Sequence, residues 1–380
     1  FLKICHEKNW LYEGTDVMPW CPRWGTGISE HEIVTDGYRD ITHQAVFVEF
    51  PLEKNANEAL LIWTTTPWTL SANIAAAVNP EIKYVKVKSN QKIYYLAKNK
   101  IDIIKDPYEI ISELSGNDLI GISYTGPFDE LPVQEGIKHK VISWEEVSDT
   151  EGTGIVHIAT GAGKEDFLLG KENDLPTIAP LDESGYFIDG FDWLTNKNVS
   201  EVNSDIFNNL SNKGLLYKIE DYLHRYPVCW RCETELVFRL VNEWFISMDE
   251  LRILIANVTR KIQWIPDFGL KRELDWLNNM DDWMISKKRY WGLALPIYKC
   301  NDCNNFEVIG SKKELEERSI SGWSSFEGHS PHRPWIDEVK IKCLNCNNEI
   351  SRIKDVGNPW LDAGIVPYST LKYGTDKDYW

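Results

Sequence analysis

The stretch Leu61-Ile62-Trp63-Thr64-Thr65-Thr66-Pro67-Trp68-Thr69-Leu70 decides how this chain is interpreted, because an apolar run passes directly into three threonines and a proline. The apolar run is typical of a buried strand. Pro67 ends the strand, since proline has no N–H to donate to a neighbouring strand. Adjacent hydroxyls at a strand end can bind water or a polar ligand. The triplet alone also fits a threonine-rich strand edge without a function.

A second stretch far downstream completes the signal: Gly152-Thr153-Gly154-Ile155-Val156-His157-Ile158-Ala159-Thr160-Gly161-Ala162-Gly163-Lys164-Glu165-Asp166-Phe167. Here a short apolar strand that carries His157 runs into a glycine-rich turn and then into an acidic pair. A helix is expected to follow over residues 166–172.

Length and composition limit the classes of protein to which the chain can belong. A chain of 380 residues can hold two or three domains with real cores. The apolar fraction of 43% and the charged fraction of 26% are those of ordinary globular proteins. No apolar run approaches the roughly 20 residues that a membrane helix needs. The net charge of −17, from 41 basic and 58 acidic residues, restricts any RNA contact to a local patch such as Lys287-Lys288-Arg289.

The ends of the chain predict an internal piece of a longer polypeptide, because the sequence starts without Met at Phe1 and stops abruptly at Trp380. Phe1 to Glu7 lacks the order of a signal peptide. The eight cysteines are interpreted from their spacing as metal ligands in a reducing cytoplasm rather than as disulfides.

The remaining segments predict an α/β fold in which a β-rich barrel is inserted. Residues 1–20 have a helical pattern. Half-buried strands are expected at 45–50, 84–87 and 92–97, with turns at Asn79-Pro80 and Gly126-Pro127. Helices are expected at 200–220, where Ile206, Leu210, Leu215 and Leu216 share a face, and at 251–258, where Leu251, Ile253, Leu254, Ile255 and Val258 are apolar.

The strongest metal signal is a pair of Cys-x-x-Cys motifs, Cys300/Cys303 and Cys343/Cys346. Zinc takes four ligands in a tetrahedron, and two such motifs supply four thiolates from facing turns. The loop between them is long and is expected to carry a helix at 312–316. We therefore predict a zinc ribbon with a structural metal, since four protein ligands leave no open position for chemistry.

A weaker pair of knuckles lies at Cys21-Pro22-Arg23-Trp24 and Cys229-Trp230-Arg231-Cys232. Trp24 takes the place of a fourth cysteine, and indole cannot ligate zinc. His224, Cys5 or His6 could supply a fourth ligand, so metal binding by Cys21, Cys229 and Cys232 stays open. With or without metal, the similarity predicts that the two segments meet as a two-stranded stem.

Two further motifs follow the stem. Asp282 to Gly292 places aromatic residues beside a basic triplet, which suits base stacking but also an ordinary helix end with extended lysines. Asp355-Val356-Gly357-Asn358-Pro359-Trp360-Leu361-Asp362-Ala363-Gly364 has the composition of a ligand-binding loop at the end of a sheet.

Taken together, these motifs resemble those of the isoleucyl-tRNA synthetases over nearly the whole chain. The resemblance is strongest at residues 63–70 with Asn73, at 152–157 and at 165–167. Residues 285–292 and 360–364 look like segments of the catalytic domain that follow the editing insertion. Thr66-Pro67-Trp68-Thr69 is similar to the isoleucine form, where the valine enzyme usually has Arg-Pro-Glu-Thr.

The resemblance implies the fold and the site. The insertion would be a post-transfer editing domain, which hydrolyses valine from isoleucine tRNA, joined to part of a Rossmann-type catalytic domain and to the zinc ribbon. Asp166 would bind the α-ammonium group of the substrate, His157 would shape the pocket against isoleucine, and Thr64, Thr65 and Thr66 would position the ester and water, with Asn73 in the same editing site. The implied substrate-binding residues are Trp68, Gly161, Gly163, Trp291, Asp355, Trp360 and Asp362.

The sequence departs from the family pattern at several places. Ala159-Thr160-Gly161-Ala162-Gly163 stands where the family usually has Ala-Pro-Gly-His-Gly, and Asp362-Ala363-Gly364 replaces Asp-Ser-Gly. The ATP-binding signatures His-Ile-Gly-His and Lys-Met-Ser-Lys-Ser are absent, so this stretch alone is not expected to form an aminoacyl-adenylate.

The resemblance divides the chain into five parts: 1–40, stem and end of the first catalytic half; 41–220, editing domain; 221–298, return stem and catalytic segment; 299–350, zinc ribbon; and 351–380, catalytic segment. Zinc is the implied cofactor here, with ATP and Mg in the intact enzyme. The implied partners are isoleucine tRNA, isoleucine and valine, and a monomer in the cytoplasm without a membrane is expected.

Three alternatives remain at this point. The chain could come from a valine- or leucine-type relative, although Trp68 argues against the valine form. It could be a non-enzymatic zinc-ribbon module that binds RNA, which the net charge and the threonine and glycine motifs disfavour. It could also be a free-standing deacylase, which would leave the residues after 240 without a role.

Overall fold

The computed structural model describes residues 1–29, 32–33 and 37–380, which divide into two compact units. The central unit comprises residues 16–241, and the terminal unit comprises residues 1–15 and 242–380. Strands β1 (Leu11–Cys21) and β12 (Val237–Ile246) contain the two places where the chain passes from one unit to the other. No helix in the described part of the chain is long and apolar enough to cross a membrane.

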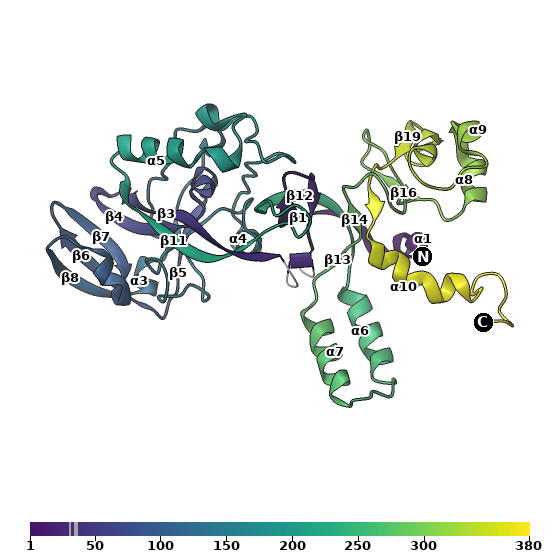
Figure 1. Ribbon diagram of the computed structural model, residues 1–380, viewed down its shortest axis with the longest axis horizontal. Helices are drawn as coiled ribbons and strands as arrows, with labels where there is room; N and C mark the ends of the chain where they lie inside the picture. Colours follow the sequence, from purple (N-terminus) through teal and green to yellow (C-terminus); the bar gives the residue numbers. More distant parts are fainter. Residues whose placement is uncertain (30–31, 34–36) are drawn as a thin grey trace. The chain divides into compact units, whose positions relative to one another are not determined.

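The central unit is built mainly of strands, with short helices between them (Figure 1). Its strands are β2 (Thr26–Gly27), β3 (Tyr38–Leu52), β4 (Asn55–Thr64), β5 (Ala75–Val78), β6 (Lys83–Ser89), β7 (Lys92–Ala97), β8 (Tyr108–Ser115), β9 (Val141–Ser143), β10 (Val156–Ile158) and β11 (Leu216–Pro227). Its helices are η1 (Pro67–Ala72), η2 (Lys98–Ile103), α3 (Gly116–Leu119), η3 (Pro132–Gln134), α4 (Lys164–Glu172), η4 (Asp192–Leu194), η5 (Val199–Glu201) and α5 (Asn203–Asn212).

Apart from β2, which pairs with β1, these strands form two separate sheets in place of the single barrel that the sequence suggested. One sheet has the order β11-β3-β4-β7-β6-β8, and the other has the order β10-β5-β9. The sheets separate because η1 interrupts the chain after β4, so that β5 starts a new ladder with β10 and β9. The consequence for function is that the end of β4 and the end of β10 belong to different sheets and can enclose a site between them.

The longest ladder joins two strands far apart in sequence. β3 and β11 run antiparallel from Tyr38↔Pro227 to Val48↔Leu216 and lie side by side in Figure 1. The inner half of β3 is buried on both faces from Ala45 to Phe50, so the expected half-buried alternation does not hold there.

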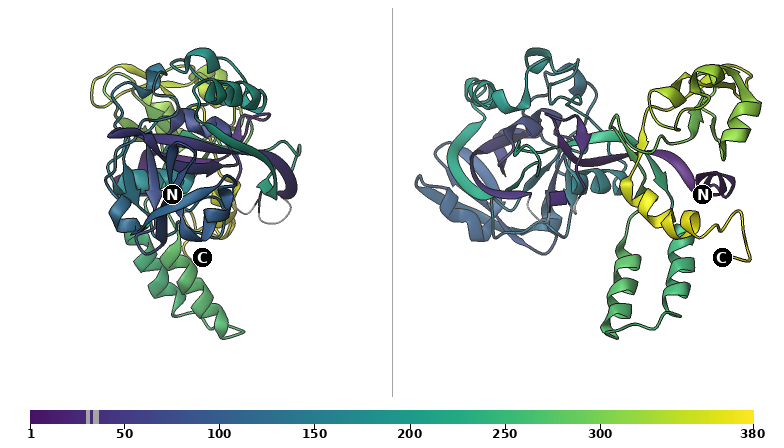
Figure 2. Two further views of the ribbon diagram at one scale, coloured as in Figure 1. Left: turned by 90° about the vertical axis from the view of Figure 1, so that its left-hand side faces the viewer. Right: turned by 45° about the vertical axis from the view of Figure 1, so that its right-hand side comes forward.

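The terminal unit contains the second set of elements. Its helices are α1 (Leu2–Glu7), α6 (Asp249–Thr259), α7 (Phe268–Asn279), α8 (Lys312–Arg318), α9 (Trp323–Phe326), η6 (Trp335–Glu338) and α10 (Pro359–Thr370). Its strands are β13 (Trp283–Met284), β14 (Ser286–Lys287), β15 (Ile297–Lys299), β16 (Phe306–Val308), β17 (Ser319–Ser321), β18 (Lys340–Lys342), β19 (Glu349–Arg352) and β20 (Val356–Gly357). Helices α6 and α7 lie side by side as a hairpin in both Figures 1 and 2.

The pairings β12–β13, β14–β20, β15–β16, β15–β19, β17–β18 and β18–β19 are all antiparallel. They give the terminal unit a five-stranded sheet in the order β16-β15-β19-β18-β17 and a two-stranded sheet of β14 and β20. The parallel sheet of a Rossmann-type domain is not among these pairings, so that part of the predicted architecture rests on the resemblance alone.

Two local predictions need correction, and a third is confirmed with an unexpected exposure. Residues 1–20 do not form one helix, because α1 ends at Glu7 and the rest is β1. The helix expected over 200–220 ends at Asn212, and Leu215 and Leu216 lead into β11. The helix expected at 251–258 exists as α6, but its apolar residues are mostly exposed: Ile253 by 64%, Leu254 by 48%, Ile255 by 38% and Val258 by 60%.

Candidate functional site

A chain of hydroxyl groups leads from the end of β4 to His157 on β10. Thr64 Oγ1 lies 3.3 Å from Thr66 Oγ1, which lies 3.2 Å from Thr69 Oγ1. Thr69 Oγ1 lies 3.0 Å from His157 Nε2. Thr64 and Thr69 are buried, and Thr66 is half-buried. The two stretches that the sequence analysis singled out, 88 residues apart, therefore meet through hydrogen bonds between side chains.

The hydrogen bonds around Thr69 determine which nitrogen of His157 carries a proton. The single hydroxyl proton of Thr69 points to the carbonyl oxygen of Thr66, 2.7 Å away. Thr69 Oγ1 must therefore accept from His157, so Nε2–H donates and Nδ1 is left as an acceptor. Nδ1 is buried and has no hydrogen-bond partner among the described residues. An acceptor of this kind is available to a hydroxyl, an ammonium group or a water molecule.

Asp166 lies in the first turn of α4, close to His157 in the chain. Its Oδ2 accepts a hydrogen bond of 2.7 Å from the backbone N–H of Ala159, two residues after His157. Gly163 precedes α4, and a Cβ there would lie 2.9 Å from the Asp166 carboxyl carbon. A side chain at Gly163 would therefore push the Asp166 carboxyl group away from the position it takes here.

Burial shifts the pKa values of the two titratable groups in opposite directions. Burial raises the pKa of Asp166 to about 6, against the lowering effect of the Ala159 N–H. Burial lowers the pKa of His157 to about 4. At neutral pH the site thus contains one carboxylate and one neutral imidazole, a combination that attracts a cation but does not itself supply one.

The glycine-rich loop between β10 and α4 is held tightly. A Cβ on Gly161 would lie 2.0 Å from the carbonyl oxygen of Ile178, so only glycine fits. Thr160 is fully buried, and its hydroxyl donates to the Pro176 carbonyl at 2.8 Å. The residues that depart from the family pattern here, Thr160 and Ala162, are therefore buried, and Thr160 makes a hydrogen bond that ties the loop to Pro176.

The other predicted residues of this site differ in how far they are buried. Trp68 is buried with 7% of its surface exposed, and Thr65 is half-buried at the turn after β4. Asn73 is 1% exposed, donates to the Ala75 carbonyl and accepts from the Tyr124 hydroxyl at 2.8 Å. These bonds give Asn73 the position of a residue that supports the turn between η1 and β5. Thr69 was not among the predicted site residues, although it lies in the stretch that defined the site.

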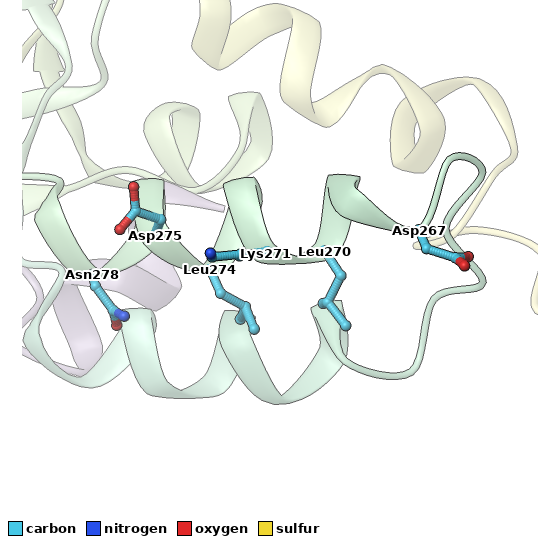
Figure 3. Close-up of a pocket in the computed structure, with 6 residues that line it drawn as sticks. All are labelled: Asp267, Leu270, Lys271, Leu274, Asp275 and Asn278. Atoms are coloured by element: carbon cyan, nitrogen blue, oxygen red, sulfur yellow. The ribbon is translucent and has the colours of Figure 1, made fainter.

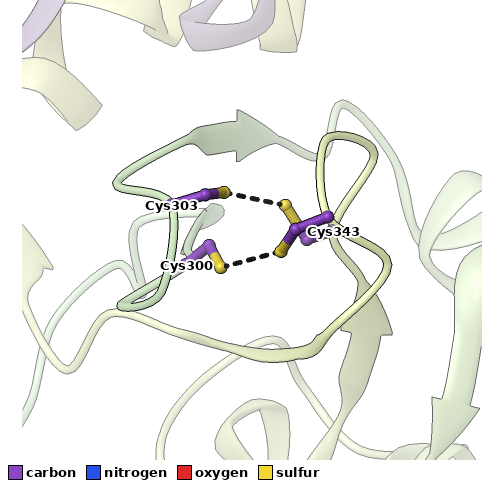
Figure 4. A group of neighbouring side chains, drawn as sticks. Cys300, Cys303 and Cys343 are labelled. Carbon is purple, nitrogen blue, oxygen red and sulfur yellow. Dashed lines mark hydrogen bonds between the residues drawn. The ribbon is translucent and has the colours of Figure 1, made fainter.

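The four cysteines of the predicted zinc ribbon come together in the terminal unit. Cys300, Cys303, Cys343 and Cys346 offer sulfur atoms that all lie within 4.8 Å of one another. Figure 4 shows three of these residues, Cys300, Cys303 and Cys343. The closest pairs are Cys300–Cys346 at 3.5 Å and Cys303–Cys343 at 3.6 Å. A tetrahedral zinc with Zn–S bonds of ~2.3 Å separates its sulfurs by about 3.8 Å. The tetrad therefore fits zinc closely, and none of the eight cysteines forms a disulfide.

The two halves of this ribbon repeat one backbone conformation. In each half the residue after the second cysteine is an asparagine with positive φ, 56° at Asn304 and 61° at Asn347. Asparagine adopts this left-handed conformation more readily than most residues. The N–H of the first cysteine then bonds to a carbonyl five residues on, at 2.8 Å for Cys300 and 2.9 Å for Cys343. The repeated Cys-x-x-Cys-Asn-Asn sequence thus encodes two matching knuckles.

The second cysteine group contains three members. Cys21, Cys229 and Cys232 lie within 4.8 Å of one another, which agrees with the predicted meeting of the two segments. The suggested fourth ligands lie elsewhere: His224 Nε2 is 2.9 Å from His43 Nδ1, the His6 ring contacts Phe306, and Cys5 is buried among apolar side chains of the terminal unit. The cluster has no fourth ligand among the described residues, and Trp24 is 52% exposed.

In the terminal unit, the motifs at 282–292 and 355–364 are brought together by the pairing of β14 with β20. Asp355 is 8% exposed and forms an ion pair with Lys288 at 3.0 Å. Glu243, which the sequence analysis did not single out, is buried beside them and accepts a hydrogen bond from Ser286. Burial raises the pKa of Glu243 to about 7.

The basic triplet is not an exposed patch. Lys287 is only 4% exposed, and Lys288 is paired with Asp355, so the expected local RNA contact at residues 287–289 is not supported. Trp291 is 67% exposed and stacks on His332 with ring centres 5.0 Å apart. Trp360 is 71% exposed at the start of α10, where Asp362 is half-buried and burial raises its pKa.

A separate surface runs along one helix of the hairpin, away from these residues. It is lined by Asp267, Leu270, Lys271, Leu274, Asp275 and Asn278. Figure 3 shows Leu270 and Leu274 pointing toward the neighbouring helix. None of the predicted site residues lines this surface, so it is not part of the candidate site.

The chain belongs to the class I tRNA synthetases, because the family profile "tRNA synthetases class I (I, L, M and V)" matches residues 1–379. Within that class it is similar to enzymes of the isoleucine type. It is 37% identical over 380 residues to the isoleucine–tRNA ligase of Methanothermobacter marburgensis, and 40% identical over 376 residues to that of Clostridium tetani. These alignments cover 99% and 98% of this chain but 36% of each relative, so the chain spans about a third of their length.

Two solved structures show weaker similarity. The crystal structure of GlLeuRS-CP1 has a TM-score of 0.40 and 13% identity, covering 47% of this chain and 99% of that one. The P. knowlesi cytosolic leucyl-tRNA synthetase editing domain has a TM-score of 0.37 and 10% identity, covering 50% of this chain and 99% of that one.

Proposed function

We propose that the central unit is the post-transfer editing domain of an isoleucine–tRNA ligase and hydrolyses valine from isoleucine tRNA. The observation that carries the proposal is the meeting of the threonine stretch after β4 with His157 and Asp166 at the end of β10. The isoleucine-type relatives, at 37% and 40% identity, support the choice of amino acid over the valine and leucine alternatives.

The chemistry of the residues suits an aminoacyl ester. The substrate carries an α-ammonium group, for which a carboxylate is the natural partner. Asp166 supplies that carboxylate, and the low pKa of His157 keeps the imidazole neutral, so it does not repel the ammonium group. The Thr64, Thr65 and Thr66 hydroxyls would position the ester and a water molecule. The Nδ1 acceptor of His157 would take one more hydrogen bond from the substrate or from that water.

A second site of this kind is needed because binding discriminates poorly between similar apolar side chains. One methylene group lets an enzyme prefer one substrate over another by only about 10- to 200-fold, and isoleucine against valine is the standard example. A pocket that accepts valine and excludes isoleucine removes the errors that the first site allows. In this proposal His157, with Trp68, Gly161 and Gly163 around it, sets the size limit.

The longer protein would attach isoleucine to its tRNA with ATP and Mg. Trp291, Asp355, Trp360 and Asp362 would bind substrates of that reaction, while Cys300, Cys303, Cys343 and Cys346 would hold a structural zinc. The three-cysteine group at Cys21 would bind metal only if a further ligand completed it. We propose a monomer that acts in the cytoplasm, and we keep the five-part division of the chain as part of this proposal.

The test is a deacylation assay with two substrates, Val-tRNA and Ile-tRNA, both charged on isoleucine tRNA. The proposal expects rapid release of valine while isoleucine is spared. Equal hydrolysis of both esters would remove the proposed discrimination. Hydrolysis of neither by the full-length protein would mean that the central unit is not an editing domain.

A further inference from the structure

The three cysteines Cys21, Cys229 and Cys232 keep the geometry of a metal site, although one ligand of a tetrahedral set is replaced. Their sulfur atoms lie within 4.8 Å of one another, and those of Cys21 and Cys232 are 3.6 Å apart. The sulfur atoms of Cys303 and Cys343, in the tetrad that fits zinc, are separated by the same 3.6 Å. Three corners of a tetrahedral zinc site are therefore in place.

The knuckle at 229–234 has the same backbone turn as the two knuckles of the zinc ribbon. The N–H of Cys229 bonds to the carbonyl oxygen of Thr234, five residues on, at 2.8 Å, and Glu233 has a φ of 58°. The ribbon knuckle that starts at Cys343 has the corresponding bond at 2.9 Å and a φ of 61° at Asn347. Glutamate adopts this left-handed conformation less readily than asparagine, so the turn is kept by its hydrogen bonds and not by that residue's own preference.

The knuckle at 21–26 makes the same turn, with Trp24 at the place of its second cysteine. The N–H of Gly25 bonds to the Cys21 carbonyl at 2.9 Å, as the N–H of Glu233 bonds to the Cys229 carbonyl at 2.8 Å. Gly25 has a φ of 57°. The backbone of a complete four-ligand site is thus retained, and only the side chain of residue 24 is unsuited to bind metal.

The indole of Trp24 does not fill the place of the missing ligand. It is 52% exposed, and the guanidinium carbon of Arg231 lies 5.8 Å from a Trp24 ring centre. Cys21 and Cys229 are buried while Cys232 is half-buried, so the cluster is open to solvent on the side of Cys232. In the described part of the chain, the apolar side chains packed with the thiols are Ile28, Ile33 and Leu236.

We propose that Cys21, Cys229 and Cys232 bind a zinc ion whose fourth position is held by water and can be taken by a small thiol. Zinc sites with three protein ligands keep this position for an exchangeable ligand. The thiol would bind as a thiolate, so that its sulfur replaces the water molecule and its proton passes to solvent. A thiolate is the soft ligand that zinc favours, and the Arg231 guanidinium beside Trp24 attracts an anion more than a neutral ligand.

The site lies in the central unit but uses none of the residues of the proposed editing reaction. Its presence can therefore be tested without a deacylation assay, and neither proposal depends on the other.

The probe is 2-mercaptoethanol, compared with 2-(methylthio)ethanol, which cannot form a thiolate. Both are titrated into the full-length protein with cobalt(II) in place of zinc, because each thiolate bound to cobalt adds to its near-ultraviolet absorption. We expect a saturable increase in that absorption with 2-mercaptoethanol alone, while the cobalt content stays unchanged. The ribbon tetrad should not respond, since its four thiolates leave no position open.

Three variants separate the open position from the rest of the site. Trp24→Cys supplies a fourth thiolate, so it should bind the metal ion and lose the response to 2-mercaptoethanol. Trp276→Cys, at an exposed tryptophan of the terminal unit, should keep the response. Cys229→Ser should contain one metal ion fewer per chain than the parent. Because the long β3–β11 ladder holds the central unit without this metal, hydrogen exchange in Cys229→Ser should rise only across residues 21–26 and 229–234.

Three results would overturn the proposal. The first is an equal metal content in the parent and in Cys229→Ser, including the case in which a disulfide joins Cys21 and Cys232 in place of the metal. The second is a parent that binds this metal ion without any response to 2-mercaptoethanol, which would show that another residue of the longer protein completes the site. The third is a response that persists in Trp24→Cys.

Discussion

Asp166 and His157 are the residues on which the proposed chemistry depends. His157 is buried and Asp166 is half-buried, and burial shifts their pKa values in opposite ways: it makes the carboxyl group harder to ionise and the imidazole harder to protonate. The carboxylate regains its charge most easily when a cation enters the site. Under the proposed function, the α-ammonium group of the substrate would be that cation.

Replacing Asp166 with Asn should slow hydrolysis of Val-tRNA by about 10- to 150-fold in kcat/KM, since a hydrogen bond to a charged group is worth about 1.5–3 kcal/mol. The amide keeps the shape and can still accept from the Ala159 N–H, so the fold should be preserved. The measurement is single-turnover release of valine, with circular dichroism to confirm folding.

The matched control for this variant is Glu165→Gln, which removes the neighbouring carboxylate from an exposed position. Its hydrolysis rate should stay within about twofold of the parent. If the two variants lost activity to the same extent, the effect would come from the net charge of α4 and not from contact with the substrate.

The pH dependence of hydrolysis should follow Asp166. Below its pKa of about 6 the carboxyl group is neutral and no longer attracts the ammonium group, so the rate should fall about tenfold per pH unit. His157, with a pKa of about 4, is neutral throughout this range and should add no step. A rate profile from pH 4.5 to 7.5 tests this, and Asp166→Asn should lose the acidic limb. An inflection near 6 that persisted in Asp166→Asn would assign the titration to another group.

The site residues could be foreseen only in part. Adjacent threonines, a histidine at a strand end and an acidic residue after a glycine-rich turn were enough to predict which segments matter. The hydrogen bond from His157 to Thr69 could not be predicted, because it depends on how β5 and β10 pair after the η1 turn. The assignment of Asn73 to the site stays a prediction, and its side chain is bonded to Ala75 and Tyr124.

At the scale of elements, the loop between β10 and α4 fixes Asp166 relative to His157. It is anchored where Gly161 passes under the Ile178 carbonyl and where Thr160 donates to Pro176. These contacts replace the rigidity that a proline would give, which is why we propose that the departure from the family pattern does not disable the site.

Gly161→Ala tests this anchor. The added Cβ would lie 2.0 Å from a backbone carbonyl, so the loop must move, and we expect the central unit to lose about 1–3 kcal/mol of stability. Valine release should fall as well, because Asp166 is displaced. The measurement is urea unfolding followed by tryptophan fluorescence, together with the deacylation rate.

Gly374→Ala is the control for this substitution, since a Cβ at Gly374 has open space and the residue lies in the terminal unit. Its stability should match the parent. An unchanged stability in Gly161→Ala would show that the loop can shift freely and that the anchor does not position Asp166.

The elements themselves were predicted unevenly. The strands at 84–87 and 92–97 followed from local alternation, and a helix at 312–316 was expected in the long loop between the two Cys-x-x-Cys motifs. The structure contains β6, β7 and α8 there. β1 was mistaken for a helix because its strand conformation depends on a partner far away in sequence. The spacing of the apolar residues in α6 predicted a helix correctly. It could not show that most of these residues are exposed.

At the scale of the whole molecule, the chain consists of two compact units with separate cores. The predicted zinc belongs to the terminal unit, where the tetrad sits beside buried residues such as Tyr298 and Ile341. Loss of the metal should therefore act on one unit.

Chelation of the metal should unfold the segment from 297 to 352 while the central unit stays folded, because four thiolates without zinc no longer join the two knuckles. Hydrogen exchange should rise across β15 to β19 and remain unchanged in β3, β4 and β11. The purified protein should contain one zinc per chain at this site, and Cys303→Ser should lose it. Simultaneous loss of protection in both units would show that they unfold cooperatively.

The most direct test of the central claim is a crystal structure with a non-hydrolysable amide analogue of valyl-adenosine, the 3′ end of the mischarged tRNA. The account predicts that the ammonium group lies within hydrogen-bond distance of the Asp166 carboxylate, with the threonine hydroxyls of residues 64–66 near the carbonyl. An analogue bound elsewhere, or one whose ammonium group is held by another residue, would contradict it.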